Sequence, residues 1–241
     1  MIVVFLRSVA FECIRFPLTI FFSFIALLTF PFKPLTRYRI ISLWARLMTW
    51  SAAFICGIGY RVVGRENLPQ EPSLILAKHQ SAWETLAFQS IFPPQVWVLK
   101  RSLLKIPFFG WGLAMTNPIA IDRTDGVQAL RQMLEQGRDR LKAGWWIVMF
   151  PEGTRIKAGE RGRYHVGGAW LASKVNTPVV PVAHNAGTLW GRGAFMKYPG
   201  TITVSVGPAI DPDGLKPAQL NKRVEDWIEQ EVARLGSARI S

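Results

Sequence analysis

The sequence predicts an α/β fold with a mixed, largely parallel sheet flanked by helices, preceded by a two-helix membrane-associating appendage. Two observations indicate this: the first 60 residues are dominated by long apolar runs, and the remainder alternates short β-branched runs with helical ones. A chain of 241 residues, 49% of them hydrophobic, is long enough for one sizeable core. We therefore expect hydrophobic membrane-associating helices over residues 1–60 and one α/β domain over residues 61–241.

The N-terminal region contains two apolar stretches. An uncharged run from Phe16 to Phe32 is near the lower length limit for a bilayer-spanning helix, and a second run from Ile40 to Tyr60 carries only Arg46. The basic segment 33–39 separates them and would end one helix and begin another. Such a pair could cross the membrane or lie within one leaflet, or it could be two buried helices of a soluble fold. Charged residues interrupt the early apolar segment, which argues against a signal peptide. We expect association with the cytoplasmic face of a membrane, the inner membrane if the source is bacterial.

The charge balance predicts an anionic partner. The formal net charge is +13, and the basic residues are scattered among Trp and Phe instead of forming a nucleic-acid-binding module. We therefore expect membrane lipid as a partner and no nucleic acid. The two cysteines, Cys13 and Cys56, lie in apolar stretches without a second pair of ligands, so we expect buried thiols with neither a disulfide nor a zinc site.

Seven short runs after residue 60 are typical of strands, and three longer ones of helices. The helices are expected over residues 125–143, 167–175 and 217–235. The strands are expected at residues 60–64, 73–77, 96–99, 118–121, 146–150, 179–182 and 201–206.

The segment 77–85 contains a histidine and a carboxylate at a predicted strand-to-helix junction. Within one helix, residues five apart point to different faces, so His79 and Glu84 can meet only if His79 precedes the helix. Ser81 followed by Glu84 has the form of a capping box, which predicts that the helix begins after Ser81. A carboxylate bonded to one ring nitrogen would leave the other free to act as a general base. Taken alone, the pattern is equally compatible with a simple helix cap.

Three further polar clusters follow predicted strands, where sites in such sheets usually lie. Lys100 and Arg101 precede an apolar segment, which suits a phosphate beside a hydrocarbon chain but also an ordinary basic turn. Asp122 and Arg123 could serve a site or form an ion pair closing a turn. The third cluster, residues 150–155, combines a flexible glycine, a hydroxyl and an arginine fork suited to phosphate oxygens.

Together these motifs resemble the 1-acylglycerol-3-phosphate acyltransferase family of glycerolipid acyltransferases. Four blocks occur in that family's order, namely His79-Gln80-Ser81-Ala82-Trp83-Glu84, Ile121-Asp122-Arg123, Phe150-Pro151-Glu152-Gly153-Thr154-Arg155 and Val180-Pro181-Val182. The resemblance covers about residues 60–210 and extends to the N-terminal helices. It implies acyl transfer from acyl-carrier protein or acyl-coenzyme A to the sn-2 hydroxyl of lysophosphatidic acid, giving phosphatidic acid.

The resemblance also implies roles for individual residues. His79 would be the base and Glu84 its orienting carboxylate, although the family more often has aspartate there. The residues Val180–Val182 would line the acyl channel. The substrate-binding residues would be Lys100, Arg123, Glu152, Gly153, Thr154 and Arg155, of which Lys100 and Arg123 would be additional phosphate ligands.

We expect direct attack on the thioester, because the sequence has neither a Gly-x-Ser-x-Gly elbow nor a cysteine in this region. Backbone amides near the start of the helix after Ser81 are the expected oxyanion donors. No metal and no cofactor other than the acyl donor are expected. The alternatives are another lysolipid or glycerol-3-phosphate as acceptor, a non-catalytic membrane lipid-binding protein, and a metal-dependent phosphoester hydrolase.

Overall fold

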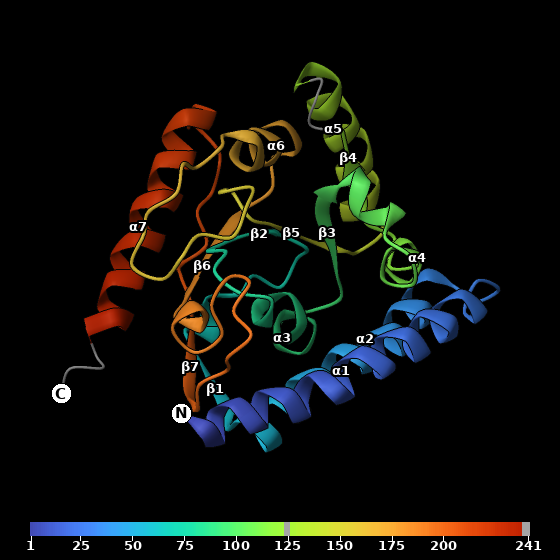
Figure 1. The fold of residues 1–241 in the computed structure, drawn as a ribbon. Helices are drawn as coiled ribbons and strands as arrows, with labels where there is room; N and C mark the ends of the chain where they lie inside the picture. Colours follow the sequence, from blue (N-terminus) through green and yellow to red (C-terminus); the bar gives the residue numbers. More distant parts are fainter. Residues whose placement is uncertain (123–125, 238–241) are drawn as a thin grey trace.

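The protein is built around one seven-stranded sheet (Figure 1). The structure, a computed structural model, describes residues 1–122 and 126–237. The strands are ordered β1-β7-β6-β2-β5-β3-β4 across the sheet. All seven predicted strands are present, with bounds β1 (Ile58–Val63), β2 (Leu74–Ala77), β3 (Gln95–Lys100), β4 (Ile119–Ile121), β5 (Trp146–Met149), β6 (Val179–His184) and β7 (Gly200–Val206).

The sheet is parallel except for one antiparallel pair, β6 with β7. The central strands β2, β5 and β6 are buried at every position, which explains their continuous apolar sequence. The mixed, largely parallel sheet is therefore confirmed. Because β2, β5, β3 and β4 all run in the same direction, the segments that follow them emerge at one edge of the sheet.

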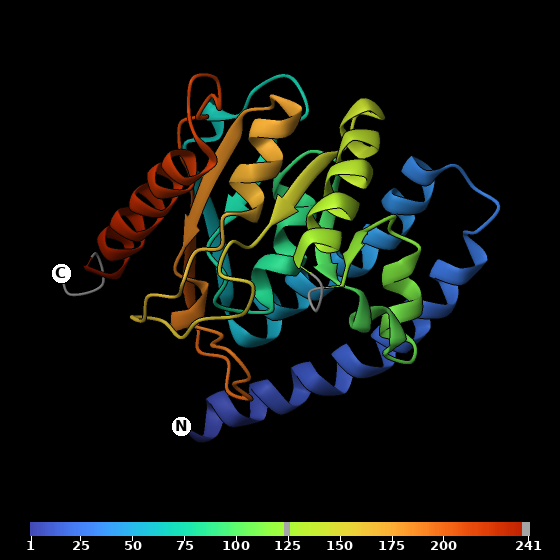
Figure 2. The same ribbon diagram turned by 90° about the horizontal axis from the view of Figure 1, so that it is seen from above.

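Helices cover both faces of the sheet (Figure 2). One face packs against α5, α6 and α7, and the other against α1, α2 and α3. The helices predicted from periodicity are present nearly as expected, whereas the sequence did not indicate the short α4. The bounds are α1 (Ile2–Leu28), α2 (Pro34–Cys56), α3 (Trp83–Ile91), α4 (Phe109–Ala114), α5 (Gly126–Lys142), α6 (Gly167–Val175) and α7 (Pro217–Ser237), with 3-10 turns η1 (Arg65–Asn67), η2 (Arg101–Lys105) and η3 (Ala186–Thr188).

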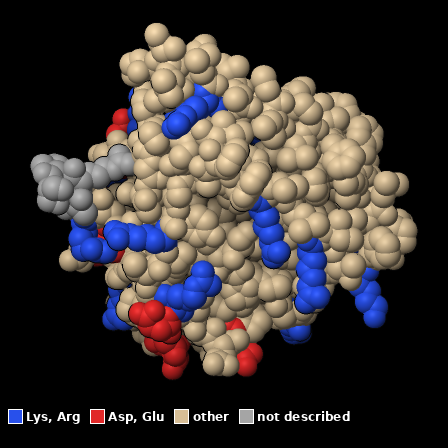
Figure 3. All heavy atoms as spheres, turned by 90° about the horizontal axis from the view of Figure 1, so that it is seen from below, with Lys and Arg blue, Asp and Glu red and all other residues tan. Residues whose placement is uncertain are grey.

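Helix α1 begins much earlier than the uncharged run that predicted it. It accommodates charged residues because Glu12 pairs with Arg15 on the same helix and with Lys197 from the domain. Among the described residues, α1 is the one helix long and apolar enough to cross a membrane by length and composition. Side chains such as Phe16 and Phe21 are exposed along it. Seen from below, the face formed by α1 and α2 is broad and mostly uncharged, with Lys and Arg side chains showing mainly toward one margin (Figure 3).

The opposite side of the two helices is part of the main core. Phe11 of α1 and Met48 of α2 are fully buried in the same cluster as Trp83 and Phe88 of α3. The segments before and after residue 60 therefore share one core. The division of the chain into two domains at this residue stays a prediction. Of the two cysteines, Cys56 is buried as expected, but the prediction for Cys13 is wrong because it lies exposed on α1.

The two sides of α1 predict different effects of the same substitution. Phe11→Ala should lower the free energy of unfolding by about 3–5 kcal/mol, because it removes a fully buried ring that packs edge-on against Trp190. Phe21→Ala, at an exposed position of the same helix, should leave it nearly unchanged. Thermal unfolding in detergent would compare them, and equal shifts would show that α1 is not part of the folded core.

Candidate active site

The loop between β2 and α3 brings a histidine and a carboxylate into contact. His79 Nδ1 lies 2.9 Å from Glu84 Oε1. This contact assigns the Nδ1 proton to the Glu84 bond, which leaves Nε2 as a proton acceptor. The imidazole is stacked on Phe150, with 3.8 Å between ring centroids, and its side chain is 13% exposed. The ring is thus held in one orientation while still reaching the cavity described below.

Glu84 orients His79 and also caps the helix. Its Oε1 accepts hydrogen bonds from the amides of Gln80 and Ser81 as well as the imidazole contact. The capping box forms in part: Ser81 Oγ accepts from the Trp83 amide, and α3 begins at Trp83. Burial raises the pKa of Glu84, but His184, His79 and the Ser81 amide together lower it by more, so its pKa is below the ordinary value. The carboxylate therefore stays charged near neutral pH.

These contacts bear on the expected oxyanion donors, which are the backbone amides near the start of the helix after Ser81. The Trp83 amide, at the first residue of α3, already donates to Ser81 Oγ. The amides of Gln80 and Ser81, just before the helix, both donate to Glu84 Oε1. Oxyanion donors at the start of α3 stay a prediction.

The segment after β5 holds the His79 backbone in place. Glu152 Oε2 accepts a 2.8 Å hydrogen bond from the His79 amide, and the Ile156 amide donates to the His79 carbonyl at 2.8 Å. Gly153 adopts a left-handed conformation with φ of 67°, which lets the chain turn directly after Glu152. The two loops are thus joined on both sides of His79, although they lie about 70 residues apart in sequence.

Glu152 also belongs to a buried ionic network. The ammonium of Lys78 is fully buried and lies 2.7 Å from Glu152 Oε1 and 2.7 Å from Glu229 Oε1. Tyr164 donates its hydroxyl to the same Glu229 oxygen at 2.8 Å. Burial raises the pKa of Glu152, and neighbouring Glu229 adds to this, so the pKa stays above its ordinary value although Lys78 and the His79 amide lower it. The network connects the loop that carries His79 to α7.

A cavity of about 630 Å³ opens beside His79. Of the residues predicted for the site, it brings together His79, Lys100, Gly153, Thr154 and Arg155. Glu152 is not among the lining residues because its carboxylate faces Lys78 and the His79 amide. Arg123 lies outside the described residues. The other lining residues are Trp44, Thr85, Gln89, Trp97, Val98, Leu99, Leu103, Phe109, Leu113, Phe150, Arg192 and Gly193.

Sequence reasoning missed the cavity walls supplied by distant segments. Arg192 comes from the loop after η3, and Trp44 from α2. Neither lies near one of the motifs. A cation on a loop with glycines on both sides was the one available signal, at Gly191-Arg192-Gly193. The expectation that Val180–Val182 line an acyl channel is wrong, because β6 is a fully buried central strand that does not reach the cavity.

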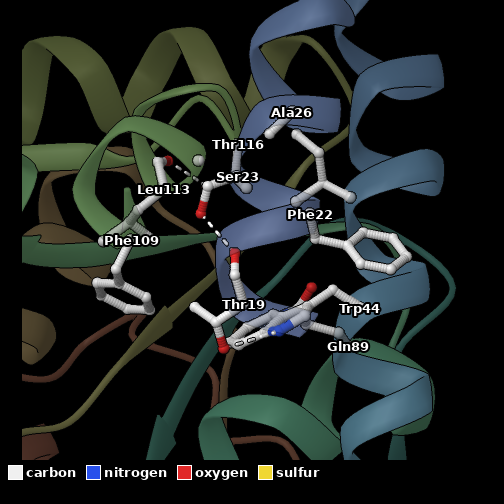
Figure 4. Close-up of a pocket in the computed structure, with 11 residues that line it drawn as sticks. Thr19, Phe22, Ser23, Ala26, Trp44, Gln89, Phe109, Leu113 and Thr116 are labelled. Carbon is white, nitrogen blue, oxygen red and sulfur yellow. Dashed lines mark hydrogen bonds between the residues drawn. The ribbon is translucent and has the colours of Figure 1, made fainter. Parts of the chain in front are cut away.

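A second, smaller hollow lies between α1, α2 and α4 (Figure 4). It adjoins the cavity, because the two share Trp44, Gln89, Phe109 and Leu113 as lining residues. The hollow has a volume of about 50 Å³ and contains more apolar than polar surface. Among its few polar groups, Trp44 Nε1 donates to Thr19 Oγ1 at 3.3 Å. The cavity beside His79 is therefore bordered on this side by a small, predominantly apolar hollow.

The other two histidines have different surroundings. His184 is fully buried, with Nε2 bonded to the Lys78 carbonyl and Nδ1 accepting from the Ala186 amide. Burial lowers the pKa of His184, which keeps it neutral. His165 is exposed. Among the residues the structure describes, no group of three or more His, Cys, Asp or Glu side chains could hold a metal ion.

The buried network around Lys78 predicts a pH-dependent loss of stability. Lys78→Met would leave Glu152 and Glu229 without their cation, and should lower the free energy of unfolding by about 3–5 kcal/mol. The folded-state pKa of Glu152, already raised by burial, would then lose the lowering effect of Lys78 and rise further. The folded state would bind more protons than the unfolded state, so stability should fall further as pH rises.

Denaturant unfolding of Lys78→Met at a mildly acidic and at a mildly alkaline pH would measure this. Lys222→Met provides a control, because Lys222 pairs with Asp226 on the exposed surface of α7 and should contribute at most about 1 kcal/mol. A loss for Lys78→Met that does not depend on pH would contradict the ionic account.

Three comparisons relate the chain to known proteins. A relative named 1-acyl-sn-glycerol-3-phosphate acyltransferase from Pseudomonas aeruginosa is 46% identical over 85% of this chain and 80% of its own length. A Saccharomyces cerevisiae protein of the same name is 30% identical over 74% of this chain and 60% of its own. The crystal structure of the lysophosphatidic acid acyltransferase PlsC from Thermotoga maritima shares the fold, with a TM-score of 0.79 over 96% of this chain and 95% of that one, at 23% identity.

The family model described as Acyltransferase matches residues 59–185, which contain the sheet up to β6 and both loops that form the site. This match covers more than half of the chain, and the bacterial relative covers 85% of it. The chain belongs to the acyltransferase family.

Proposed function

We propose that this enzyme transfers a fatty acyl group from a thioester donor, acyl-carrier protein or acyl-coenzyme A, to the sn-2 hydroxyl of lysophosphatidic acid. The observation that carries the proposal is the position of the His79–Glu84 pair at a cavity that Thr154 and Arg155 also line. A base and a phosphate-binding arginine at one cavity suit an acceptor that carries both a hydroxyl and a phosphate. The relatives named above support the same reaction.

In this mechanism His79 Nε2 takes the proton of the acceptor hydroxyl as its oxygen attacks the thioester carbonyl. The carbon–oxygen bond forms, the carbon–sulfur bond breaks, and the proton passes from the imidazolium to the departing thiolate. Glu84 stabilises the imidazolium because it is charged, buried and bonded to Nδ1. Glu152 does not contact the substrate in this mechanism. It is a positioning residue that fixes the His79 backbone.

The apolar hollow between α1, α2 and α4 suits a hydrocarbon chain. Trp44, Phe109 and Leu113 line both it and the main cavity, so an acyl chain could enter beside His79 and extend between the helices. Lys100 is at the same cavity and would add positive charge for a phosphate group. This arrangement supports a lipid substrate over a water-soluble glycerol-3-phosphate acceptor.

We further propose that the enzyme works on the cytoplasmic face of a membrane. The exposed aromatic and aliphatic side chains of α1 and α2 form a broad apolar surface, and basic residues lie along its margin (Figure 3). A lysolipid held in the membrane would reach a cavity whose walls include α2 and α4. The soluble thioester donor would approach from the aqueous side.

His79→Ala should lower turnover by about 10²-fold or more, because it removes a positioned general base. His165→Ala is a matched control, since this exposed histidine lies outside the cavity lining and should retain activity. The assay uses purified protein in detergent with lysophosphatidic acid and either thioester. Undiminished turnover of folded His79→Ala would remove the histidine from the mechanism.

A panel of acceptors and donors separates the remaining alternatives. Lysophosphatidic acid should have the highest kcat/KM, above lysophosphatidylglycerol and glycerol-3-phosphate, with phosphatidic acid as the product. Comparing acyl-carrier protein with acyl-coenzyme A identifies the donor. Binding of lysolipid without transfer from either thioester, in both wild type and His79→Ala, would instead indicate a non-catalytic lipid-binding protein.

A further inference from the structure

The loop that carries Arg192 is fixed against the glycerol-phosphate side of the cavity. Arg192 Nη1 donates a 2.8 Å hydrogen bond to the Arg155 carbonyl, and both residues line the cavity with Thr154. The Arg155 guanidinium has a buried Nε that finds no acceptor among the described residues. Two guanidinium groups therefore lie at one side of the cavity, and one of them has a buried donor available to a ligand.

This Arg192 loop, residues 189–198, is anchored to α1 by a buried lysine. Lys197 Nζ lies 2.7 Å from Glu12 Oε1 of α1 and donates to the Phe195 carbonyl at 2.9 Å. The Lys197 amide donates to Ser8 Oγ, also on α1, at 3.0 Å. At the base of the loop, the Tyr198 amide donates to the Leu189 carbonyl at 2.9 Å. The membrane-facing helix thus determines where the loop lies.

Aromatic rings enclose the lysine head group. Its Nζ lies 5.2 Å, 5.0 Å and 5.5 Å from the ring centroids of Phe11, Trp190 and Phe195. Lys197 is 1% exposed, so its charge is compensated by Glu12 and these ring faces instead of water. Removing either charged partner would loosen the loop from α1.

The charge of the cavity favours one class of acceptor headgroup. None of its lining residues in the described ranges is aspartate or glutamate, whereas Lys100, Arg155 and Arg192 are all cationic. A phosphomonoester carries about −1.5 to −2 charges at neutral pH. A phosphodiester carries a single charge and has one terminal oxygen fewer. Two guanidinium groups therefore suit the greater charge and the additional terminal oxygen of the monoester.

We propose that Arg192 is a second guanidinium ligand of the acceptor's phosphate, which together with Arg155 selects phosphomonoester lysolipids over phosphodiester ones. Lys197 and Glu12 are its positioning residues. The proposal rests on the acyl transfer proposed above and assigns the headgroup selectivity of that site. It also gives α1 a role in substrate selection, because the helix holds the loop that carries Arg192.

Arg192→Gln tests this role in the purified full-length protein in neutral detergent. The KM for lysophosphatidic acid should rise about tenfold or more, as expected for losing one charge-assisted contact, while kcat changes less than about twofold. The KM for lysophosphatidylglycerol should change much less, so the ratio of the two kcat/KM values should fall. Arg131→Gln, on the exposed face of α5, is the control and should change neither.

Three results would overturn the assignment. They are an unchanged lysophosphatidic acid KM in Arg192→Gln, an equal change for both acceptors, or a rise confined to the KM of the thioester donor. Absence of transfer by the wild-type protein would instead contradict the proposed reaction, so the two failures are distinguishable. Arg155→Gln, measured alongside, should also raise the lysophosphatidic acid KM.

Lys197→Met tests the anchor, and Glu12 keeps its Arg15 partner in this variant. The KM for lysophosphatidic acid should rise severalfold with little change in kcat, and the double variant with Arg192→Gln should show little additional increase. Glu12→Gln provides a second, milder variant with the same expected direction. A fall in kcat that is equal for both acceptors, with KM unchanged, would contradict positioning by the anchor.

Discussion

The Glu152 carboxylate is the contact on which the arrangement of the site depends. One of its oxygens binds the His79 amide, and the other pairs with the buried ammonium of Lys78. The two loops that it joins emerge side by side because β2 and β5 are adjacent parallel strands. A buried carboxylate with a cation on one oxygen and an amide on the other has little freedom to move, so it fixes the backbone that carries the imidazole.

The imidazole is then oriented by separate groups. Glu84 binds Nδ1 and at the same time two amides of the loop, and Phe150 stacks on the ring. One carboxylate therefore fixes both the shape of the loop and the direction of the histidine.

The N-terminal helices pack against the α/β domain and also form an ionic contact with it. Their inner side chains belong to the main core, their outer side chains form an apolar surface, and Trp44 of α2 lines the cavity. The buried Lys197–Glu12 pair adds an ionic contact between α1 and the loop at the cavity mouth. The apolar outer surface and the side chains that line the cavity therefore belong to different sides of these helices.

The sequence by itself determined the succession of the strands and of most helices, and it indicated that His79 and Glu84 could meet at the start of a helix. Periodicity and capping are local properties, and each can be recognised within a few residues of chain. Only the tertiary structure decided that β1 lies beside β7, that Glu152 points toward Lys78 instead of into the cavity, and that Arg192 lines the site. These features depend on strand order and on side-chain direction. Contacts between segments about 40 to 180 residues apart establish them, and local sequence patterns do not encode such contacts.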